Sequence, residues 1–231
     1  MQIPFGEWLP DQPAHGMKGA NVATNVYHAL GSYKRFPSLV SYSSNNITKN
    51  AKGAGSFRDN ANNIFNFVAT RTDIFQLASG AFTSRKSGLT GGEADYVTFT
   101  QFGNYVIASN GVDQPQYYLM GTSTNFANLN AIQSAGTTPL FRVSGVVRDF
   151  LVSGNISTAT NRIHWSGIND ISAWSGKQSD FQDLPGSGGK IVHLTSGEVG
   201  YVFRQNQIIR MDYVGGSVVF RLSVISPNRG A

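Results

Sequence analysis

The strongest constraint on the fold of this chain is a strand–turn–strand unit that occurs four times in the sequence. Each copy has an alternating apolar run, a short polar turn and a second apolar run. The copies begin near Ile64, Tyr105, Asp149 and Gly200, so they are about 41, 44 and 51 residues apart. A period of about 40–45 residues with several short strands in each repeat is typical of β-propeller blades. The sequence therefore predicts an all-β, propeller-like protein with four-stranded antiparallel blades.

The strand pattern occupies residues 46–231 and divides into four predicted blades. Their approximate ranges are 53–84, 96–129, 141–174 and 191–225. Only short helical turns are expected, near Asn125–Ala131 or Ile168–Trp174. Four blades is the low end of the known range for propellers, and the sequence stops directly after the last predicted strand. We therefore expect these blades to be part of a larger propeller, with a complete four-bladed ring as the alternative.

Residues 1–45 differ from the repeats and are predicted to form an extended arm. Four prolines and several glycines interrupt any long helix here, because proline lacks an amide hydrogen and restricts the residue before it. The segment is nevertheless rich in large apolar side chains, which a free tail would leave in water. We expect the arm to pack against its own blades or against a neighbouring subunit. The aromatic candidates for such contacts are Tyr27, Tyr33 and Phe36.

The positive charge of the chain is concentrated in its first part. The formal net charge is +5, and between Asp11 and Asp59 there are six basic residues and no acidic one. Such an excess suits a polyanion or an acidic protein surface, and a solvated basic face is the alternative of equal weight. The candidate contact residues are Lys34, Arg35, Lys49, Lys52 and Arg58.

The composition excludes several classes of protein. The chain has no cysteine, which excludes disulfide frameworks, thiolate zinc sites and cysteine nucleophiles. No apolar run of about 18 residues occurs, so no membrane-spanning helix is expected. Residues 1–10 contain Glu7 and two prolines where a secretory signal has its apolar region, so no such signal is expected. Apolar residues make up 40% of the chain, which is enough for a packed core.

Candidate catalytic and cofactor motifs fail on their spacing. The run Gly186–Lys190 is similar to a phosphate-binding loop, but Leu184 and Ile191 occupy the positions that require a glycine and a hydroxyl residue. The four histidines have no His or carboxylate at a metal-ligand spacing, and His164 is expected to be a hydrogen-bonded residue within a blade. The sequence therefore predicts no enzyme, no cofactor and no metal site.

A carbohydrate-binding or polysaccharide-degrading propeller that acts on a host cell surface is the alternative function. Such an enzyme would use two carboxylates at a shared site, and nothing in the sequence brings two of them together. The tryptophans Trp165 and Trp174 could stack on sugars, although packing between blades is the favoured role. The available acids are Asp149, Asp170, Asp180, Asp183, Glu198 and Asp212.

Two segments carry a resemblance to a known group of proteins. The first is Asn25-Val26-Tyr27 followed by residues 31–40, which contain Gly31, the pair Lys34-Arg35 and Pro37. The second is residues 162–174, in which a strand ending in Trp-Ser precedes a loop with Asp170 and Trp174. Together with residues 180–185 and 228–230, these segments resemble the propeller-bearing tail proteins of short-tailed bacteriophages. That group includes the tail nozzle (tail tubular protein B) and packaged-DNA stabilisation proteins. Ile171 stands where the group has a proline.

The resemblance implies a non-enzymatic structural protein of the virion tail that is synthesised in the host cytoplasm. Proteins of this group assemble as rings of identical subunits, often hexamers, below the portal and adaptor. They form or close the DNA exit channel and help to retain and eject the genome. The expected partners are therefore further copies of the chain, adaptor or portal-proximal proteins, and DNA in weak non-specific contact. Members are commonly much longer than 231 residues, which agrees with the expectation of a larger propeller.

Overall fold

The computed structural model describes residues 6–11, 15, 19–29 and 32–231. The chain divides into two compact units, Met1–Tyr42 and Ser43–Ala231. Its described residues form β-strands and one short 3-10 helix, and they contain no α-helix. Within this part of the chain, no helix is long and apolar enough to cross a membrane. The prediction of an all-β, propeller-like fold is confirmed.

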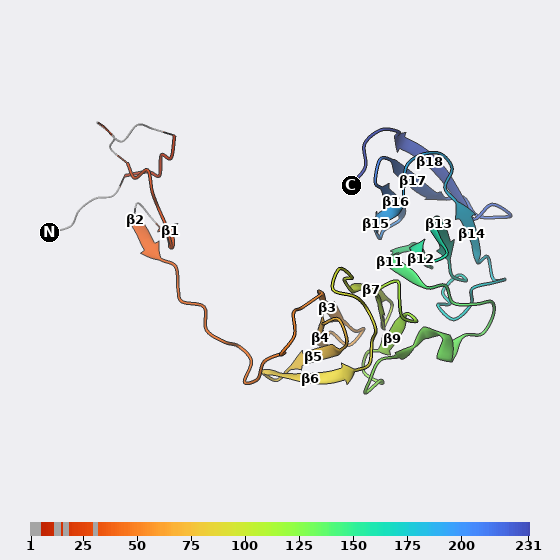
Figure 1. Ribbon diagram of the computed structural model, residues 1–231, viewed down its shortest axis with the longest axis horizontal. Helices are drawn as coiled ribbons and strands as arrows, with labels where there is room; N and C mark the ends of the chain where they lie inside the picture. The colour runs from red at the N-terminus through yellow and green to blue at the C-terminus, as the bar shows by residue number, and fades with distance from the viewer. Residues whose placement is uncertain (1–5, 12–14, 16–18, 30–31) are drawn as a thin grey trace. The chain divides into compact units, whose positions relative to one another are not determined.

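The second unit consists of four antiparallel sheets of four strands each, which we call the first to fourth blades (Figure 1). The first blade contains β3 (Gly53–Arg58), β4 (Ile64–Ala69), β5 (Ile74–Ala78) and β6 (Ala81–Lys86). The second contains β7 (Thr98–Phe102), β8 (Tyr105–Ser109), β9 (Gln116–Leu119) and β10 (Ala127–Asn128). The third contains β11 (Phe141–Val147), β12 (Phe150–Ile156), β13 (Ala159–Trp165) and β14 (Asp180–Asp183). The fourth contains β15 (Ile191–Leu194), β16 (Val199–Arg204), β17 (Ile208–Tyr213) and β18 (Phe220–Ser226).

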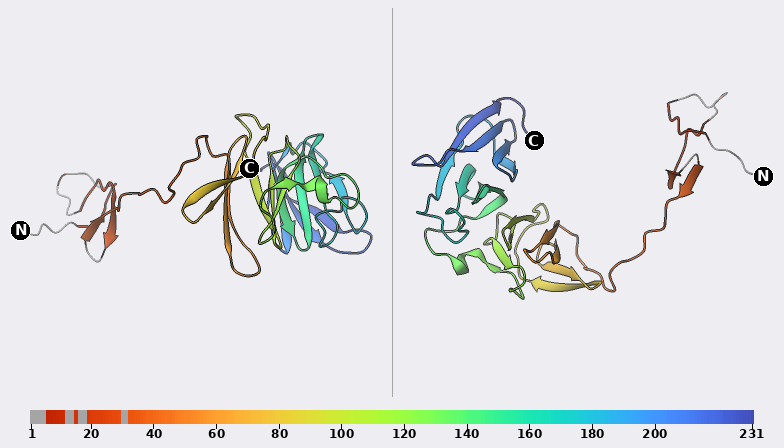
Figure 2. Two further views of the ribbon diagram at one scale, coloured as in Figure 1. Left: turned by 90° about the horizontal axis from the view of Figure 1, so that it is seen from below. Right: turned by 180° about the vertical axis from the view of Figure 1, so that it is seen from behind.

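The four blades follow one another along an open arc, which is seen from the front in Figure 1 and from behind in Figure 2. In each blade the strand order equals the chain order, and the first strand lies on the inner side of the arc. Successive inner strands contact one another, β3 with β7, β7 with β11, and β11 with β15. This radial succession of four-stranded sheets is the arrangement of propeller blades.

Each junction between blades also has a hydrogen bond on or beside an inner strand. The three bonds run from Val97 N to Lys52 O (2.9 Å), from Thr98 Oγ1 to Arg142 O (2.7 Å) and from Gly197 N to Val146 O (2.8 Å). Backbone NH and C=O groups at the inner edge that are not paired within their own sheet need other hydrogen-bond partners. The neighbouring blade supplies partners for some of these groups. The same type of junction is therefore repeated three times along the arc.

The core consists of three separate apolar clusters, one at each junction. Phe67 and Tyr118 pack edge to face between the first and second blades, with ring centroids 5.0 Å apart. Strand β12 shows why neighbouring clusters stay separate. Successive side chains of a strand point to opposite faces of its sheet. Phe150 and Val152 accordingly join the cluster with the fourth blade, whereas Leu151 joins the cluster with the second.

The repeat detected in the sequence corresponds to the second and third strands of each blade, such as β4–β5 and β16–β17. These strands lie between two others in each sheet and supply many residues of the core clusters, so they carry the apolar pattern. Outer strands carry less of this signal. The sequence predicts an end of the third blade at residue 174, but the blade continues to β14 (Asp180–Asp183). This strand carries no apolar signal because all four of its side chains are exposed. The only helical turn of the described residues, Leu129–Ile132, lies in one of the two expected places.

The first unit contains little regular structure in its described residues. A two-stranded hairpin pairs β1 (Val26–Ala29) with β2 (Ser32–Arg35), and a parallel bridge joins Trp8 to Ala20. Of the predicted arm, residues 1–5, 12–14, 16–18 and 30–31 lie outside the described residues, and Gly31 of the first resemblance segment is among them. An isolated two-stranded hairpin is only marginally stable, so this unit depends on further contacts for its order.

Candidate functional site

The eight predicted contact residues are divided between the two units. Five lie on or next to the hairpin of the first unit, and three lie beside or within the first blade. Those of the hairpin are Tyr27, Tyr33, Lys34, Arg35 and Phe36, and those of the blade are Lys49, Lys52 and Arg58. The cluster predicted from the sequence thus consists of two groups with different surroundings.

The hairpin group exposes aromatic rings and positive charges together. The register of the hairpin pairs Tyr27 with Lys34, and the backbone NH of Phe36 donates to the carbonyl of Asn25 at 2.7 Å. These contacts bring the rings of Tyr27 and Phe36 edge to face, with centroids 6.5 Å apart, while both rings remain about half exposed. Lys34 and Arg35 are exposed and have no ion pair among the described residues.

Tyr33 has a different environment from the other two aromatic residues. Its hydroxyl donates a hydrogen bond of 2.9 Å to the carbonyl of Gly6, and its side chain is partly buried. The bond connects the hairpin to a segment 27 residues earlier in the sequence. Tyr33 therefore helps to hold the first unit together, and Tyr27 and Phe36 are the aromatic residues available to a partner.

Two of the three basic residues beside the first blade form ion pairs with acids from distant parts of the sequence. Lys49 Nζ lies 2.8 Å from Asp73 Oδ2 and 2.5 Å from Thr72 Oγ1. Lys52 donates to the backbone carbonyl of Glu93 at 2.5 Å, and the Glu93 carboxylate lies 3.5 Å from Lys52. Glu93 also pairs with Arg71, at 3.0 Å.

The ionisation of Asp73 reflects this pairing. Burial alone would raise the pKa of Asp73, but the hydrogen bonds from Lys49 and Thr72 together outweigh it and hold the pKa below its ordinary value. Asp73 therefore carries its negative charge at neutral pH and balances Lys49. Of the three basic residues in this group, only Arg58 is exposed without an ion pair among the described residues.

The sequence concealed these ion pairs because their partners are brought together by the sheets. Asp73 is 24 residues from Lys49, and its turn joins β4 to β5. Glu93 lies in the connection between the first and second blades, 41 residues from Lys52. A stretch of sequence without acidic residues can therefore still have acidic side chains beside it in the fold.

The glycine-rich loop at residues 185–189 binds a buried arginine. Arg204 on β16 is 1% exposed, and its guanidinium donates to the carbonyls of Pro185 (2.8 Å), Gly186 (3.4 Å) and Gly189 (2.9 Å) and to Oε1 of Gln207 (2.7 Å). The polarity of this arrangement is opposite to that of a phosphate loop, in which backbone NH groups converge on an anion. The expectation that this run is no nucleotide site agrees with the geometry.

Close packing explains the glycine within this loop. A Cβ atom at Gly188 would lie 2.7 Å from the guanidinium carbon of Arg204, closer than such atoms approach. Burial lowers the pKa of the Arg204 guanidinium, but an arginine remains protonated at any physiological pH. The four acceptor oxygens therefore stabilise the buried positive charge of Arg204, which would be costly without them. Arg204 thereby connects the loop to β16.

His164 is a structural residue of the third blade. Its Nε2 lies 3.2 Å from the carbonyl oxygen of Trp174, and the two rings pack edge to face at 5.1 Å. Burial lowers the pKa of His164 below 6.5, so the imidazole is neutral at pH 7. Among the described residues, no group of three or more His, Asp or Glu side chains could hold a metal ion.

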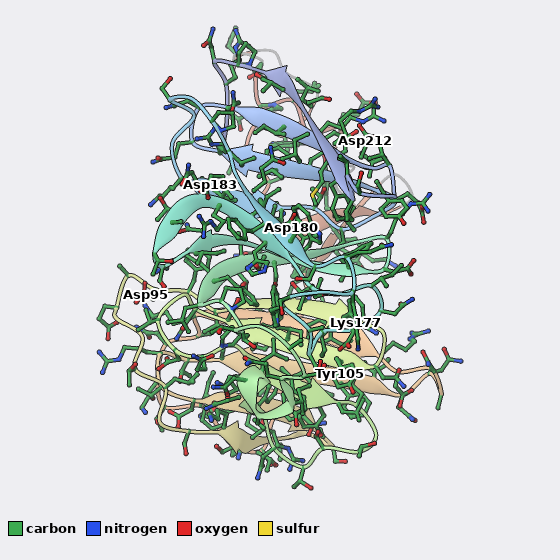
Figure 3. All side chains as sticks on the ribbon, turned by 90° about the vertical axis from the view of Figure 1, so that its right-hand side faces the viewer. Asp95, Tyr105, Lys177, Asp180, Asp183 and Asp212 are labelled. Carbon is green, nitrogen blue, oxygen red and sulfur yellow. The ribbon has the colours of Figure 1, made fainter. Side chains whose placement is uncertain are left out.

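Four of the six candidate acids of the third and fourth blades, Asp170, Asp183, Glu198 and Asp212, form ion pairs among the described residues. Asp183 binds Arg162 through two hydrogen bonds of 2.6 and 2.8 Å, and Asp170 binds Lys177 at 2.6 Å. The hydrogen bonds from Arg162 lower the pKa of Asp183. A general acid of a glycosidase needs a raised pKa, which is the opposite shift. Figure 3 shows Asp183 and Asp212 on the sheets of different blades.

The two candidate sugar-stacking tryptophans belong to the core. Trp165 and Trp174 are 4% and 3% exposed, and each is a member of an apolar cluster between blades. The Trp165 ring nitrogen donates to the carbonyl of Gln178 at 2.8 Å. Packing between blades, the favoured role of these side chains, is what the structure shows.

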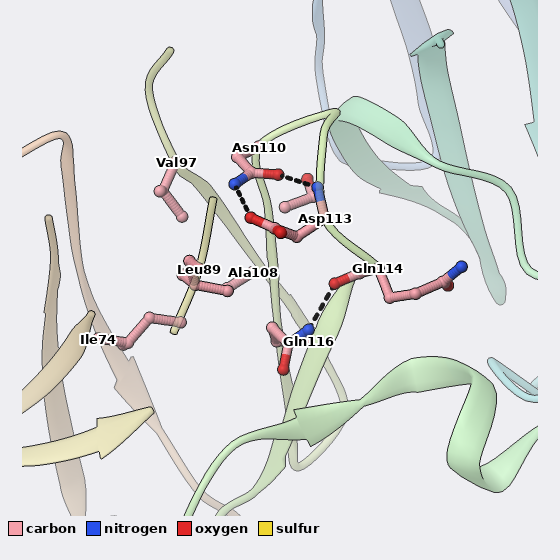
Figure 4. A pocket seen from close by; sticks show the side chains of 9 residues that line it. Ile74, Leu89, Val97, Ala108, Asn110, Asp113, Gln114 and Gln116 are labelled. Carbon is pink, nitrogen blue, oxygen red and sulfur yellow. Dashed lines mark hydrogen bonds between the residues drawn. The ribbon is translucent and has the colours of Figure 1, made fainter. Parts of the chain in front are cut away.

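A small cavity lies near the junction of the first and second blades (Figure 4). Its volume of about 10 Å³ contrasts with about 300–1,000 Å³ for typical ligand pockets. Apolar side chains such as Ile74 and Leu89 line one side, and a hydrogen bond of 2.7 Å from Asn110 to Asp113 closes the other. The cavity is too small for a substrate or cofactor.

The likeness to known proteins is confined to solved structures. No protein-family model matches the sequence, and no curated protein is similar to it. The extracellular domain of a hybrid two-component system from B. thetaiotaomicron is 12% identical, with a TM-score of 0.50 over 78% of this chain and 22% of that chain. Virginiamycin B lyase from Staphylococcus aureus is 11% identical, with a TM-score of 0.48 over 76% of this chain and 56% of that chain.

A designed protein, Ika4, is 14% identical, with a TM-score of 0.46, and the match covers 82% of this chain and 100% of that chain. This chain thus spans about half the length of the lyase and less than a quarter of the extracellular domain. At such low identity the likeness concerns the fold alone, because one fold hosts many functions. None of the three is named as a tail protein.

Proposed function

We propose that this protein is a structural component of a bacteriophage tail, a nozzle or hub subunit without enzymatic activity. It is synthesised in the host cytoplasm and assembles with copies of itself into a ring, hexameric in the form the resemblance implies. The ring lies below the portal and adaptor, forms or closes the DNA exit channel, and helps to retain and eject the genome.

The observation that carries this proposal is the place of residues 162–174 in the fold. This segment of the resemblance coincides with the end of β13 and the loop that follows it. The loop is anchored by the buried Trp174 and by Asp170, whose carboxylate accepts hydrogen bonds from Ser172 and Lys177. The resembling residues are thus those that build a blade, as a shared scaffold requires.

The hairpin is the part of the chain best suited to an adaptor or portal-proximal partner. Aromatic side chains and arginine are enriched at the cores of protein interfaces. Tyr27, Phe36 and Arg35 provide both types of side chain on one short element. We therefore place on the hairpin both the contact between neighbouring subunits of the ring and the contact with an adaptor or portal-proximal protein.

Contact with DNA is expected to be weak. A channel that releases a genome needs dispersed positive charge, because tight phosphate binding would oppose movement of the DNA. The ion pairs of Lys49 and Lys52 reduce the positive charge beside the first blade and agree with weak binding. Lys34, Arg35 and Arg58, which have no ion pair within the part of the chain that the structure describes, are the candidates for this contact.

The test is to purify the 231-residue chain, image it by negative-stain electron microscopy, and measure its binding to duplex DNA and to an oligosaccharide panel. We expect rings, weak DNA binding without sequence preference that is lost at moderate salt, and no glycan binding. The double variant Tyr27→Ala, Phe36→Ala should lose the ring, whereas the control Tyr42→Ala should keep it, because Tyr42 is exposed outside the hairpin. Binding or cleavage of an oligosaccharide, in the absence of rings, would overturn the proposal and favour the carbohydrate-acting alternative.

A further inference from the structure

The first blade has a face rich in apolar side chains, none of which belongs to a core cluster. Phe67 on β4 points into the cluster with the second blade, so the alternate residue Val68 lies on the opposite face. The register of the sheet pairs Val68 with Phe75 and Leu77 with Phe82, and these side chains share that face. We call Ile64, Val68, Phe75, Leu77 and Phe82 the leading face; none belongs to a core cluster.

The face of the fourth blade that points away from the third blade likewise supplies no residue to a core cluster; its register places Arg210, Asp212 and Arg221 on it beside the apolar side chains. Val202 on β16 points into the cluster with the third blade, so its neighbours Tyr201 and Phe203 lie on the opposite face. The register pairs Phe203 with Ile208, and the His193 ring packs beside Phe203 at 6.1 Å. We call His193, Val199, Tyr201, Phe203 and Ile208 the trailing face; none belongs to a core cluster.

The two faces are of complementary kinds. At each of the three junctions, the trailing side of one blade packs against the leading side of the next. Between the third and fourth blades, Phe150 on a second strand packs against Tyr213 on a third strand, with centroids 5.8 Å apart. A further junction would likewise bring together a second and a third strand, β16 with Tyr201 and β5 with Leu77.

A single chain does not form this fourth junction. The sheets of the first and fourth blades share no hydrogen-bonded pairing among the described residues, and no apolar cluster contains residues of both. The arc in Figure 1 is open between them. Ile64 and His193 are exposed and the other residues that define the two faces are partly buried, so each end of the arc leaves part of an apolar surface in contact with water.

We propose that a second copy of this chain closes the arc. The trailing face of each copy packs on the leading face of the other, so two identical junctions continue the three that each chain already contains. Four blades from each copy make eight, within the range of about four to eight blades known for propellers. A head-to-tail contact that closes after two copies has twofold symmetry and leaves no free end. This inference does not rest on the tail role.

The absence of cysteine makes a crosslinking test specific. The double variant Leu77→Cys, Tyr201→Cys, treated with a short bismaleimide, should give a covalent dimer and no longer species. Either single variant alone should remain uncrosslinked, because neither face meets itself. A mixture of the two single variants should give the dimer. Crosslinking within one chain would show that the four blades close into a ring. Crosslinking of a single variant would show a dimer in which a face meets itself, and a series of larger species would show an open filament. Each of these three results would overturn the proposal.

A second measurement uses charge to separate the copies. The native mass of the full chain should be that of an even number of copies. We expect Leu77→Glu on the leading face, and separately Phe203→Glu on the trailing face, to weaken pairing by roughly tenfold or more, as is usual when a central interface residue is lost. The control Ser157→Glu changes an exposed turn of the third blade and should leave the mass unchanged. Circular dichroism confirms that each variant is folded, and pairing that survives in a folded variant of both faces would overturn the proposal.

The hairpin variant separates this inference from the proposed function. Tyr27→Ala, Phe36→Ala should abolish larger rings and leave pairs, whereas Leu77→Glu should abolish pairs. If the N-terminal unit covers the leading face instead, the 231-residue chain will be a monomer, and the chain without residues 1–42 will form dimers. A monomeric full chain would contradict the proposal.

Discussion

The two units of this protein use aromatic residues in opposite ways. In the blades, Phe67, Phe141 and Trp174 are at most 3% exposed, whereas Trp8, Tyr27 and Phe36 of the first unit are each about half exposed. The blade residues occupy alternate positions of paired strands, so each sheet aligns them against the next. The residues of the first unit lie between prolines and on one short hairpin, which offers no second layer to cover them. Apolar content alone does not make a core; regular spacing on partnered strands does.

The same substitution in the two units should show the largest contrast. Phe67→Ala removes a buried ring from the cluster between the first and second blades, and we expect it to lower the free energy of unfolding by about 3–5 kcal/mol. Phe36→Ala should change it by no more than about 0.5 kcal/mol, because the ring is already in water. Urea denaturation followed by circular dichroism measures both values. An equal loss in the two variants would show that the hairpin belongs to the folded core.

A pair of arginines extends this contrast to charged residues. Arg204→Met leaves the carbonyls around Pro185–Gly189 without their donor, and we expect a loss of about 2–3 kcal/mol. Arg58→Met should be close to neutral, since Arg58 is exposed and has no ion pair among the described residues. Faster proteolysis near residues 185–189 in Arg204→Met would confirm that the arginine orders this loop. Equal unfolding midpoints for the two variants would contradict that role.

A smaller effect should appear with pH. Because burial lowers the pKa of His164 in the folded protein, the unfolded chain takes up a proton near pH 6.5 that the folded protein does not. Stability should therefore fall as the pH is lowered through 6.5, by no more than about 1.4 kcal/mol per pH unit for one proton. The loss stops once the pH is below the folded pKa.

The pH effect can be assigned with two variants. His164→Asn should remove this part of the pH dependence, whereas His15→Asn, at an exposed position outside the blades, should keep it. Thermal unfolding at pH 7.5 and at pH 5 compares them. A similar pH dependence in His164→Asn and the parent would exclude His164 as its source.

The smallest effect on stability should come from the five candidate cations. Replacing Lys34, Arg35, Lys49, Lys52 and Arg58 with Gln should change the free energy of unfolding by about 1 kcal/mol or less, because exposed charges and surface ion pairs contribute little. DNA binding, measured by fluorescence anisotropy against salt, should nevertheless fall. The double variant Lys34→Gln, Arg35→Gln should produce more of this loss than Lys49→Gln, Lys52→Gln, since the latter pair is already neutralised. The reverse order would place the DNA contact on the first blade.

The sequence was sufficient to predict the blades because their middle strands carry the alternating apolar pattern. Strands β4, β8, β12 and β16 begin within one residue of the four repeat positions. Strand β14 was not detected, because Asp180–Asp183 forms an outer edge whose side chains all lie in water. Its four residues show no alternation of buried and exposed side chains, so no periodic signal marks this strand.

The candidate site was less predictable than the fold. The hairpin contact between Tyr27 and Phe36 is local, but the pairing of Lys49 with Asp73 depends on the turn between two strands. The contacts of Arg204 likewise join β16 to a loop that precedes β15. The spacing of residues in Gly186–Lys190 was enough to exclude a phosphate-binding loop. It did not indicate that the loop surrounds Arg204.

The separation of the core into three clusters sets an order of opening. Within residues 43–231, opening the second or third blade breaks two clusters, whereas opening the first or fourth breaks only one. Local unfolding should therefore begin at the two ends of the arc and move inward, as in stacked repeat proteins. Amide hydrogens of β4 and β17 would exchange with solvent before those of β8 and β12. A partner that covers the first and fourth blades would remove this difference in exchange rate, and the four blades would then unfold cooperatively.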